Sequence, residues 1–134
     1  MSASHFIYSA ICIGIANIFI EWLFIGFLFH KYQALTPQTW KPESPKSYAY
    51  SSALSIFFGA LFTLFYFKIG FQYVIPGNLF SASKYGVLCF GCFTVLPEIT
   101  GYIYVNLSKG FVVGKLLSGF FTYLAAGIIA CLFY

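Results

Sequence analysis

The chain has 134 residues, of which 60% are hydrophobic, 23% aromatic and only 7% charged. Soluble globular domains carry about 25% charged residues, and a chain this short cannot bury so much apolar surface in one water-soluble core. The composition therefore excludes an ordinary soluble domain and predicts a polytopic membrane protein whose main partner is the lipid bilayer.

The net charge of +4 comes from lysines alone, because the chain contains no arginine and no aspartate. A nucleic-acid-binding surface needs lysine and arginine clustered on one face, so we predict no nucleic-acid partner. We interpret the lysines as topology signals and as side chains that extend to the membrane surface. They stand singly near the ends of the predicted helices, at Lys31, Lys41, Lys46, Lys68, Lys84, Lys109 and Lys115.

Four apolar segments are long enough to cross a bilayer, a crossing that takes roughly 20 residues. Backbone groups in lipid must pair within their own segment, and these segments lack the alternating pattern of a barrel strand. The sequence therefore predicts an all-α protein with one transmembrane domain, an integral membrane four-helix bundle with antiparallel neighbours. The expected helices cover about residues 6–29, 48–67, 85–104 and 111–133.

The ends of these segments predict their order and orientation. The first has no basic region before it and contains Glu21, so we interpret it as a retained helix rather than a cleaved signal peptide. Ser44 and Pro45 form a typical helix start. We expect the protein in a bacterial inner membrane. The lysine bias predicts that the first and third linkers are cytoplasmic and that both termini lie outside the cytoplasm.

Each predicted helix also carries small or polar residues at steps of three and four, which places them on one face. Small faces let helix backbones approach closely in lipid, so these stripes predict a compact bundle with a small-residue interior. The stripes comprise Ala10, Gly14 and Asn17, leading to Glu21; Ser52, Ser55, Gly59 and Thr63; Gly91, Thr94, Glu98 and Gly101; and Gly110, Gly114, Ser118, Thr122, Ala125 and Ala126.

Three ionisable residues fall inside the predicted spans. At about 1.5 Å per residue, Glu98 lies roughly 20 Å along its helix from Tyr85, Glu21 lies at a similar depth, and Lys115 enters from the other side. We expect Glu21, Glu98 and Lys115 to form one polar layer, with Asn17 one turn away. The layer is either a Glu–Lys pair that fixes helix register or a proton-titrating or ligand-binding site.

Pro97 stands beside Glu98 in the stretch "TVLPEIT". It cannot donate a backbone hydrogen bond to the carbonyl of Phe93, so we expect the third helix to be kinked at Pro97. The ordinary interpretation is a packing bend, and the neighbouring glutamate also favours a cavity.

The stretch "CFGC" places Cys89 and Cys92 three residues apart. They could serve a quinone-coupled thiol oxidoreductase, but no second cysteine pair and no arginine support that chemistry. We favour inert packing cysteines. His5 and His30 are predicted on opposite sides of the membrane, so we expect no metal site and no cofactor.

The second half, "GCFTVLPEITGYIYVNLSKGFVVGKLLSGFFTYLAAGIIACLF", combines an aromatic and a proline in the third helix with a short basic linker and a small-residue final helix. Together with "IEWLFIGFLFHKYQALTPQTW" in the first half, it resembles small uncharacterised bacterial membrane proteins of domain-of-unknown-function family 1761. The Trp-Tyr-Gly-Pro stretch usual in that family is replaced by "FIGFLFHKY". The resemblance implies a four-helix membrane protein and no particular activity.

Three functions compete at this stage. The one we expect first is a structural or accessory bundle that assembles with itself or with a larger membrane complex, because the small faces and short loops favour it. The intramembrane glutamates favour a proton-coupled transporter of a small apolar or cationic compound. A membrane enzyme, either the thiol oxidoreductase or a glutathione-type transferase, is the third. It is disfavoured because we find no nucleophile–base pair, metal-ligand spacing or phosphate loop.

Overall fold

The computed structural model describes residues 3–133, which contain helices and no strand. Within them are four helices long and apolar enough to cross a membrane, as expected for an all-α bundle. The first span joins α1 (Ala3–Glu21) to a π-helical segment, η1 (Trp22–Leu28), and the second is α2 (Pro45–Lys68). The third joins α3 (Leu79–Phe90), η5 (Gly91–Val95) and α4 (Leu96–Tyr104), and the fourth is α5 (Lys109–Leu132).

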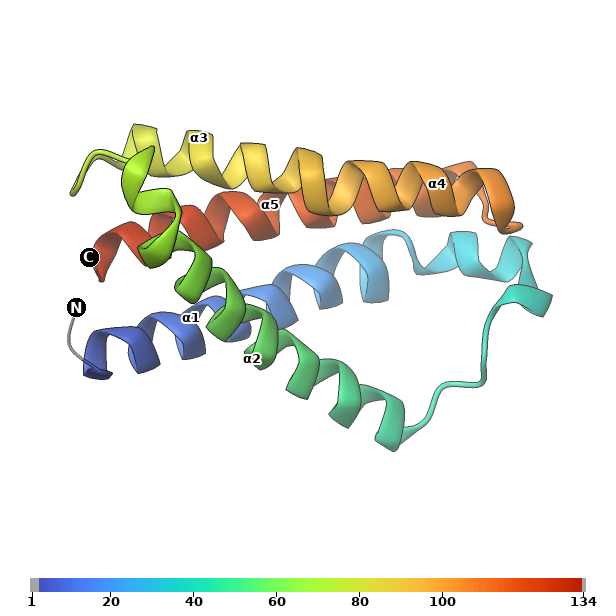
Figure 1. The fold of residues 1–134 in the computed structure, drawn as a ribbon. Helices are drawn as coiled ribbons and strands as arrows, with labels where there is room; N and C mark the ends of the chain where they lie inside the picture. Colours follow the sequence, from blue (N-terminus) through green and yellow to red (C-terminus); the bar gives the residue numbers. More distant parts are fainter. Residues whose placement is uncertain (1–2, 134) are drawn as a thin grey trace.

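The spans alternate in direction, so both ends of the described chain lie at the same end of the bundle (Figure 1). Helix α1 packs against α2 and α5, and α3 packs against α5. The predicted bundle with antiparallel neighbours is therefore confirmed. Short 3-10 turns lie in the linkers: η2 (His30–Leu35), η3 (Pro37–Thr39) and η4 (Gly70–Gln72).

Side-chain caps define the starts of three spans. Ser44 accepts a hydrogen bond from the backbone N–H of Ser47, with Pro45 at the first helical position, as the sequence predicts. Asn78 caps α3 in the same way through the N–H of Ser81, and Ser108 caps α5 through that of Phe111. Because of the Asn78 cap the third span begins at Leu79 and not near Tyr85, where the apolar run becomes continuous.

The helices are in backbone contact near the termini because glycine occupies the crossing points. A Cβ atom on Gly59 would lie 2.1 Å from the carbonyl oxygen of Ala10, and one on Gly127 would lie 2.5 Å from that of Ala82. On Gly86 it would lie 2.3 Å from the carbonyl oxygen of Tyr123. These residues hold α1 on α2 and α3 on α5, which is the use that small residues have in membrane bundles.

Aromatic side chains fill the core beside these crossings. Tyr66 is only 1% exposed, and its ring meets that of Tyr85 edge to face at 5.6 Å. Phe62 meets both Tyr85 and Tyr123 edge to face, at 6.1 and 5.9 Å. The rings therefore join α2 to α3 and α5 at this end, in the geometry that aromatic pairs prefer.

Towards its start, α2 diverges from the other helices (Figure 1). At the same end, the first linker is tied to the start of α5. Thr39 donates a hydrogen bond to the carbonyl of Asn106 at 2.8 Å, and Ser108 donates one to that of Tyr32 at 2.9 Å. We call the part of the four spans near the termini the packed half; it comprises residues 3–14, 59–68, 79–90 and 123–132. We call the rest of the spans the open half; it comprises residues 15–28, 45–58, 91–104 and 109–122.

The disturbance predicted at Pro97 takes the form of a wider turn immediately before it. The helix has π geometry over Gly91–Val95 and returns to α geometry at Leu96, so Pro97 occupies the first turn of α4. Because η5 runs directly into α4, a carbonyl of the preceding turn still lacks the N–H that a residue other than proline would donate. Both prolines and π turns are recognised causes of helix bending, and here they coincide.

Candidate functional site

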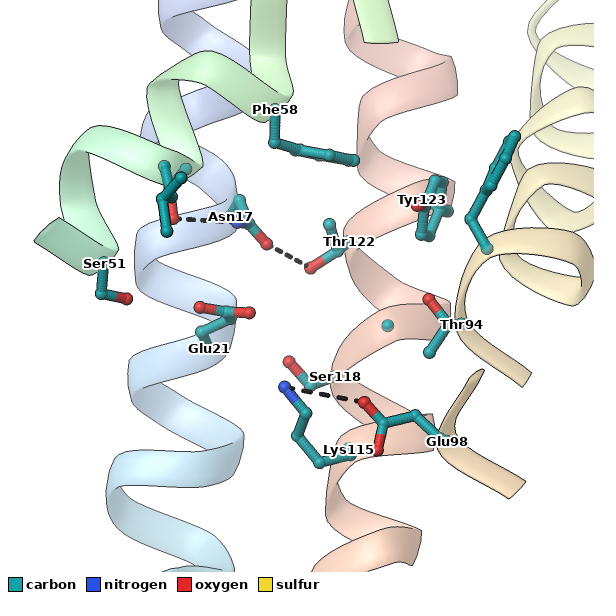
Figure 2. Close-up of a pocket in the computed structure, with 14 residues that line it drawn as sticks. Asn17, Glu21, Ser51, Phe58, Thr94, Glu98, Lys115, Ser118, Thr122 and Tyr123 are labelled. Carbon is teal, nitrogen blue, oxygen red and sulfur yellow. Dashed lines mark hydrogen bonds and ion pairs between the residues drawn. The ribbon is translucent and has the colours of Figure 1, made fainter. Parts of the chain in front are cut away.

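The open half contains a cavity of about 440 Å³ bounded by α1, α2, α5 and the η5–α4 segment. We call it the polar chamber. Figure 2 shows side chains from α1 and α5 and from the η5–α4 segment directed into it. Its polar lining includes all four residues predicted to form an intramembrane layer, together with neighbouring hydroxyls: Asn17, Glu21, Glu98, Lys115, Ser118 and Thr122.

Asn17 joins three helices at the inner end of the chamber. Its amide nitrogen donates to the hydroxyl of Ser55 on α2 at 3.0 Å, and its carbonyl oxygen accepts from the hydroxyl of Thr122 on α5 at 3.0 Å (Figure 2). The three residues are between 3% and 8% exposed. Because buried polar groups are costly when unpaired, this chain of bonds fixes the positions of α1, α2 and α5 relative to each other.

Glu98 from α4 and Lys115 from α5 project into the chamber side by side (Figure 2). The ammonium nitrogen of Lys115 lies 3.9 Å from a carboxylate oxygen of Glu98, and the two side chains are 32% and 23% exposed. Charge-assisted hydrogen bonds between such groups are usually about 2.7–2.9 Å long. The two residues therefore form a loose ion pair that remains open to the cavity.

Glu21 lines both the polar chamber and a second cavity of about 620 Å³, which lies towards the first linker. Lys115 also lines both. The second cavity contains Glu43, which accepts a hydrogen bond from the hydroxyl of Tyr48 and lies 3.9 Å from a ring nitrogen of His30. The chain has only three acidic residues, and each of them lines one of these two cavities.

The apolar part of the chamber wall includes three aromatic residues, Phe58 from α2, Phe93 from η5 and Tyr123 from α5, beside Leu54. Phe58 and Tyr123 meet edge to face with their centroids 5.4 Å apart. Aromatic faces attract cations through their quadrupole, and carboxylates attract them through charge. The chamber therefore offers both groups that recognise organic cations.

Sequence reasoning missed the bonding partners of Asn17 and the residues of the second cavity. Ser55 and Thr122 belong to the small-residue stripes, and that pattern predicts only a packing role for them. The signal that could have revealed these bonds is depth: the two hydroxyls lie at the same predicted depth as the amide of Asn17. Glu43, His30 and Tyr48 lie in or beside a linker, where no periodicity relates them to the helices.

The four cysteines are free thiols. Cys89 and Cys131 are buried in the packed half, whereas Cys12 and Cys92 are exposed. Among residues 3–133, no group of three or more histidines, cysteines and acids lies close enough to hold a metal ion.

Comparisons with known protein families, with curated proteins and with solved structures find no match. The resemblance described from the sequence stays a prediction.

Proposed function

We propose that this protein binds a small organic cation in the polar chamber and exchanges it for protons, as a proton-coupled transporter. The main support is the distribution of acids. The chain as a whole carries a net charge of +4, yet its three glutamates all line the two neighbouring cavities, against one lysine. A surplus of carboxylates in a cavity among membrane-spanning helices favours a positively charged ligand.

The size and lining of the chamber support the same class of ligand. A volume of about 440 Å³ is within the range of small-molecule sites. Phe58, Phe93 and Tyr123 contribute aromatic rings, and Glu21 and Glu98 contribute carboxylates. A neutral apolar ligand would gain little from these carboxylates, so the cationic alternative is the one that we propose.

Coupling to protons follows from the cost of unpaired charge. Glutamates inside a membrane protein need a counter-charge or a proton, because an isolated charge there is unfavourable by at least roughly 2.5 kcal/mol. Lys115 can compensate only one of Glu21 and Glu98. When the ligand leaves, the surplus carboxylate takes up a proton, so cation and proton exchange.

The lysine distribution supports an orientation for this exchange. Five lysines lie at or near the first and third linkers, at the end where the open half lies, and Lys68 and Lys84 lie towards the other end. The excess of positive charge favours an orientation in a bacterial inner membrane in which the open half faces the cytoplasm and both termini lie outside. The chamber then loads from the cytoplasmic side.

The test uses purified protein in vesicles of phosphatidylethanolamine and phosphatidylglycerol, with an acidic interior and a trapped pH-sensitive dye. External benzyltrimethylammonium should raise the internal pH. Glu98→Gln should remove the response, whereas Thr100→Val should retain it, because the Thr100 hydroxyl bonds only its own helix, at the carbonyl of Leu96. A rate equal to that of protein-free vesicles would contradict the proposal.

A second candidate is assembly with itself or with a larger membrane complex. Two of the predicted small residues, Gly91 and Gly101, have no atom within 4 Å of an added Cβ, so this chain does not use them for its own packing. Such positions allow another helix to approach closely. Native mass spectrometry of gently solubilised protein would detect copies or partner subunits, and Gly91→Leu should reduce them if this face is the contact.

A further inference from the structure

Lys115 is the one lysine of the chain's seven that lines either of the two cavities. It extends from α5 beside Ser118 into the space between Glu21 and Glu98 (Figure 2). A lysine in this position is itself a primary ammonium ion, held on a flexible four-carbon stem. It therefore presents to Glu98 the same kind of charge that the proposed ligand would present.

The pairing of Lys115 with Glu98 has the properties of a displaceable contact. The nitrogen–oxygen distance of 3.9 Å leaves the charge-assisted hydrogen bond unformed, and neither side chain is fully buried. Lys115 also lines the second cavity, as does Glu21. The ammonium group can thus move away from Glu98 and stay beside a carboxylate.

We infer that Lys115 is an internal competitor: its ammonium group occupies the cation site of the empty protein, and the ligand displaces it towards Glu21 and the second cavity. This inference rests on the proposed cation binding. It assigns Lys115 a role in specificity, because a ligand must interact with Glu98 and the aromatic wall more favourably than the tethered ammonium does. The displaced lysine then compensates Glu21 while the ligand compensates Glu98.

The consequence distinguishes this role from a structural one. If the ion pair only fixed the helices, its removal would weaken the fold and leave binding equal or weaker. If Lys115 competes with the ligand, its removal strengthens binding, because the ligand no longer displaces a like charge.

The experiment is calorimetric titration of the purified protein with benzyltrimethylammonium. Lys115→Met should bind the cation roughly tenfold more tightly than the unchanged protein, the effect expected for strongly coupled neighbouring charges. Lys115→Arg keeps a tethered cation and should bind within about threefold of the unchanged protein. Lys84→Met removes a lysine that lies over the ring of Phe80, outside both cavities, and should not alter binding.

Lys115→Gln serves as a second neutral variant if Lys115→Met does not fold, and it should also bind more tightly. If the unchanged protein binds the cation and the folded neutral variants bind it equally or less tightly, Lys115 does not compete and the inference fails alone. If none of these proteins binds the cation, the proposed function fails together with it. A gain in affinity shared by Lys84→Met would assign the effect to net charge and would also overturn the inference.

Discussion

The two halves of this bundle are built from the same four helices and differ in what lies between them. In the packed half, Gly59, Gly86 and Gly127 bring backbones into contact, and rings such as Tyr66 fill the remaining space. In the open half, α2 diverges, and the interior holds a cavity with Glu21 and Glu98 in its walls.

The difference teaches how a chain of this size can hold acids inside its membrane-spanning part. The packed half supplies close van der Waals contact, which is a main source of helix association in lipid. In the open half, a cavity lined by polar side chains replaces some of this contact. Its helices keep their positions through the bonds of Asn17 to Ser55 and Thr122, at the boundary between the two halves.

The largest effect should come from adding one methyl group in the packed half. Gly59→Ala should reduce the free energy of unfolding by about 3 kcal/mol, because the new Cβ meets the backbone of α1 and cannot be relieved by a side-chain rotation. Gly101→Ala is the matched control in the open half, where nothing lies within 4 Å, and should change it by about 1 kcal/mol or less. Reversible unfolding in detergent measures both. Equal effects would remove the distinction between the halves.

The boundary should be the next most sensitive place. Asn17→Leu removes both of its side-chain hydrogen bonds and leaves the hydroxyls of Ser55 and Thr122 without this partner, so we expect a loss of about 2 kcal/mol. Thr100→Val is the control, since its hydroxyl is exposed and bonds its own helix. The same unfolding assay applies. A loss no larger than that of the control would mean that these bonds do not join the halves.

Substitutions of Glu98 in the open half should affect stability least. Glu98→Gln should change the free energy of unfolding by about 1 kcal/mol or less, as for partly exposed ion pairs, because the amide oxygen still places a partial negative charge beside Lys115. Glu98→Leu should cost more, because it leaves the ammonium group of Lys115 without a polar partner at this position in the chamber. Unfolding of the two variants side by side gives the comparison. A leucine variant as stable as the glutamine variant would show that Lys115 does not depend on Glu98.

The fold was largely predictable, and the chamber only in part. Apolar length alone predicts the four spans, and the chemistry of Ser44 and Pro45 predicts the start of α2. Rise per residue predicts that Glu98 and Lys115 reach the same depth, and the structure brings them to 3.9 Å. Each of these features depends on the sequence of a single helix, or on counting residues along two helices from the membrane surface.

The features that escaped prediction depend on how helices are inclined to one another. No local pattern reveals that α2 diverges over the residues before its crossing at Gly59, and that divergence opens the cavity. The Asn78 cap lies several residues before the apolar run becomes continuous, so the apolar pattern predicts a start for α3 that is too late. Glu43 comes beside Tyr48 and His30 only through the course of the first linker.

The most direct test of cation binding by the glutamates of the open half is calorimetric titration. Benzyltrimethylammonium is titrated into the unchanged protein and into the double variant Glu21→Gln/Glu98→Gln. Two buffers with different heats of ionisation also report the protons released on binding. We predict saturable binding with proton release for the unchanged protein, and affinity at least about tenfold weaker without proton release for the double variant. Equal affinity in a folded double variant would contradict the claim that the glutamates of the open half hold a cation.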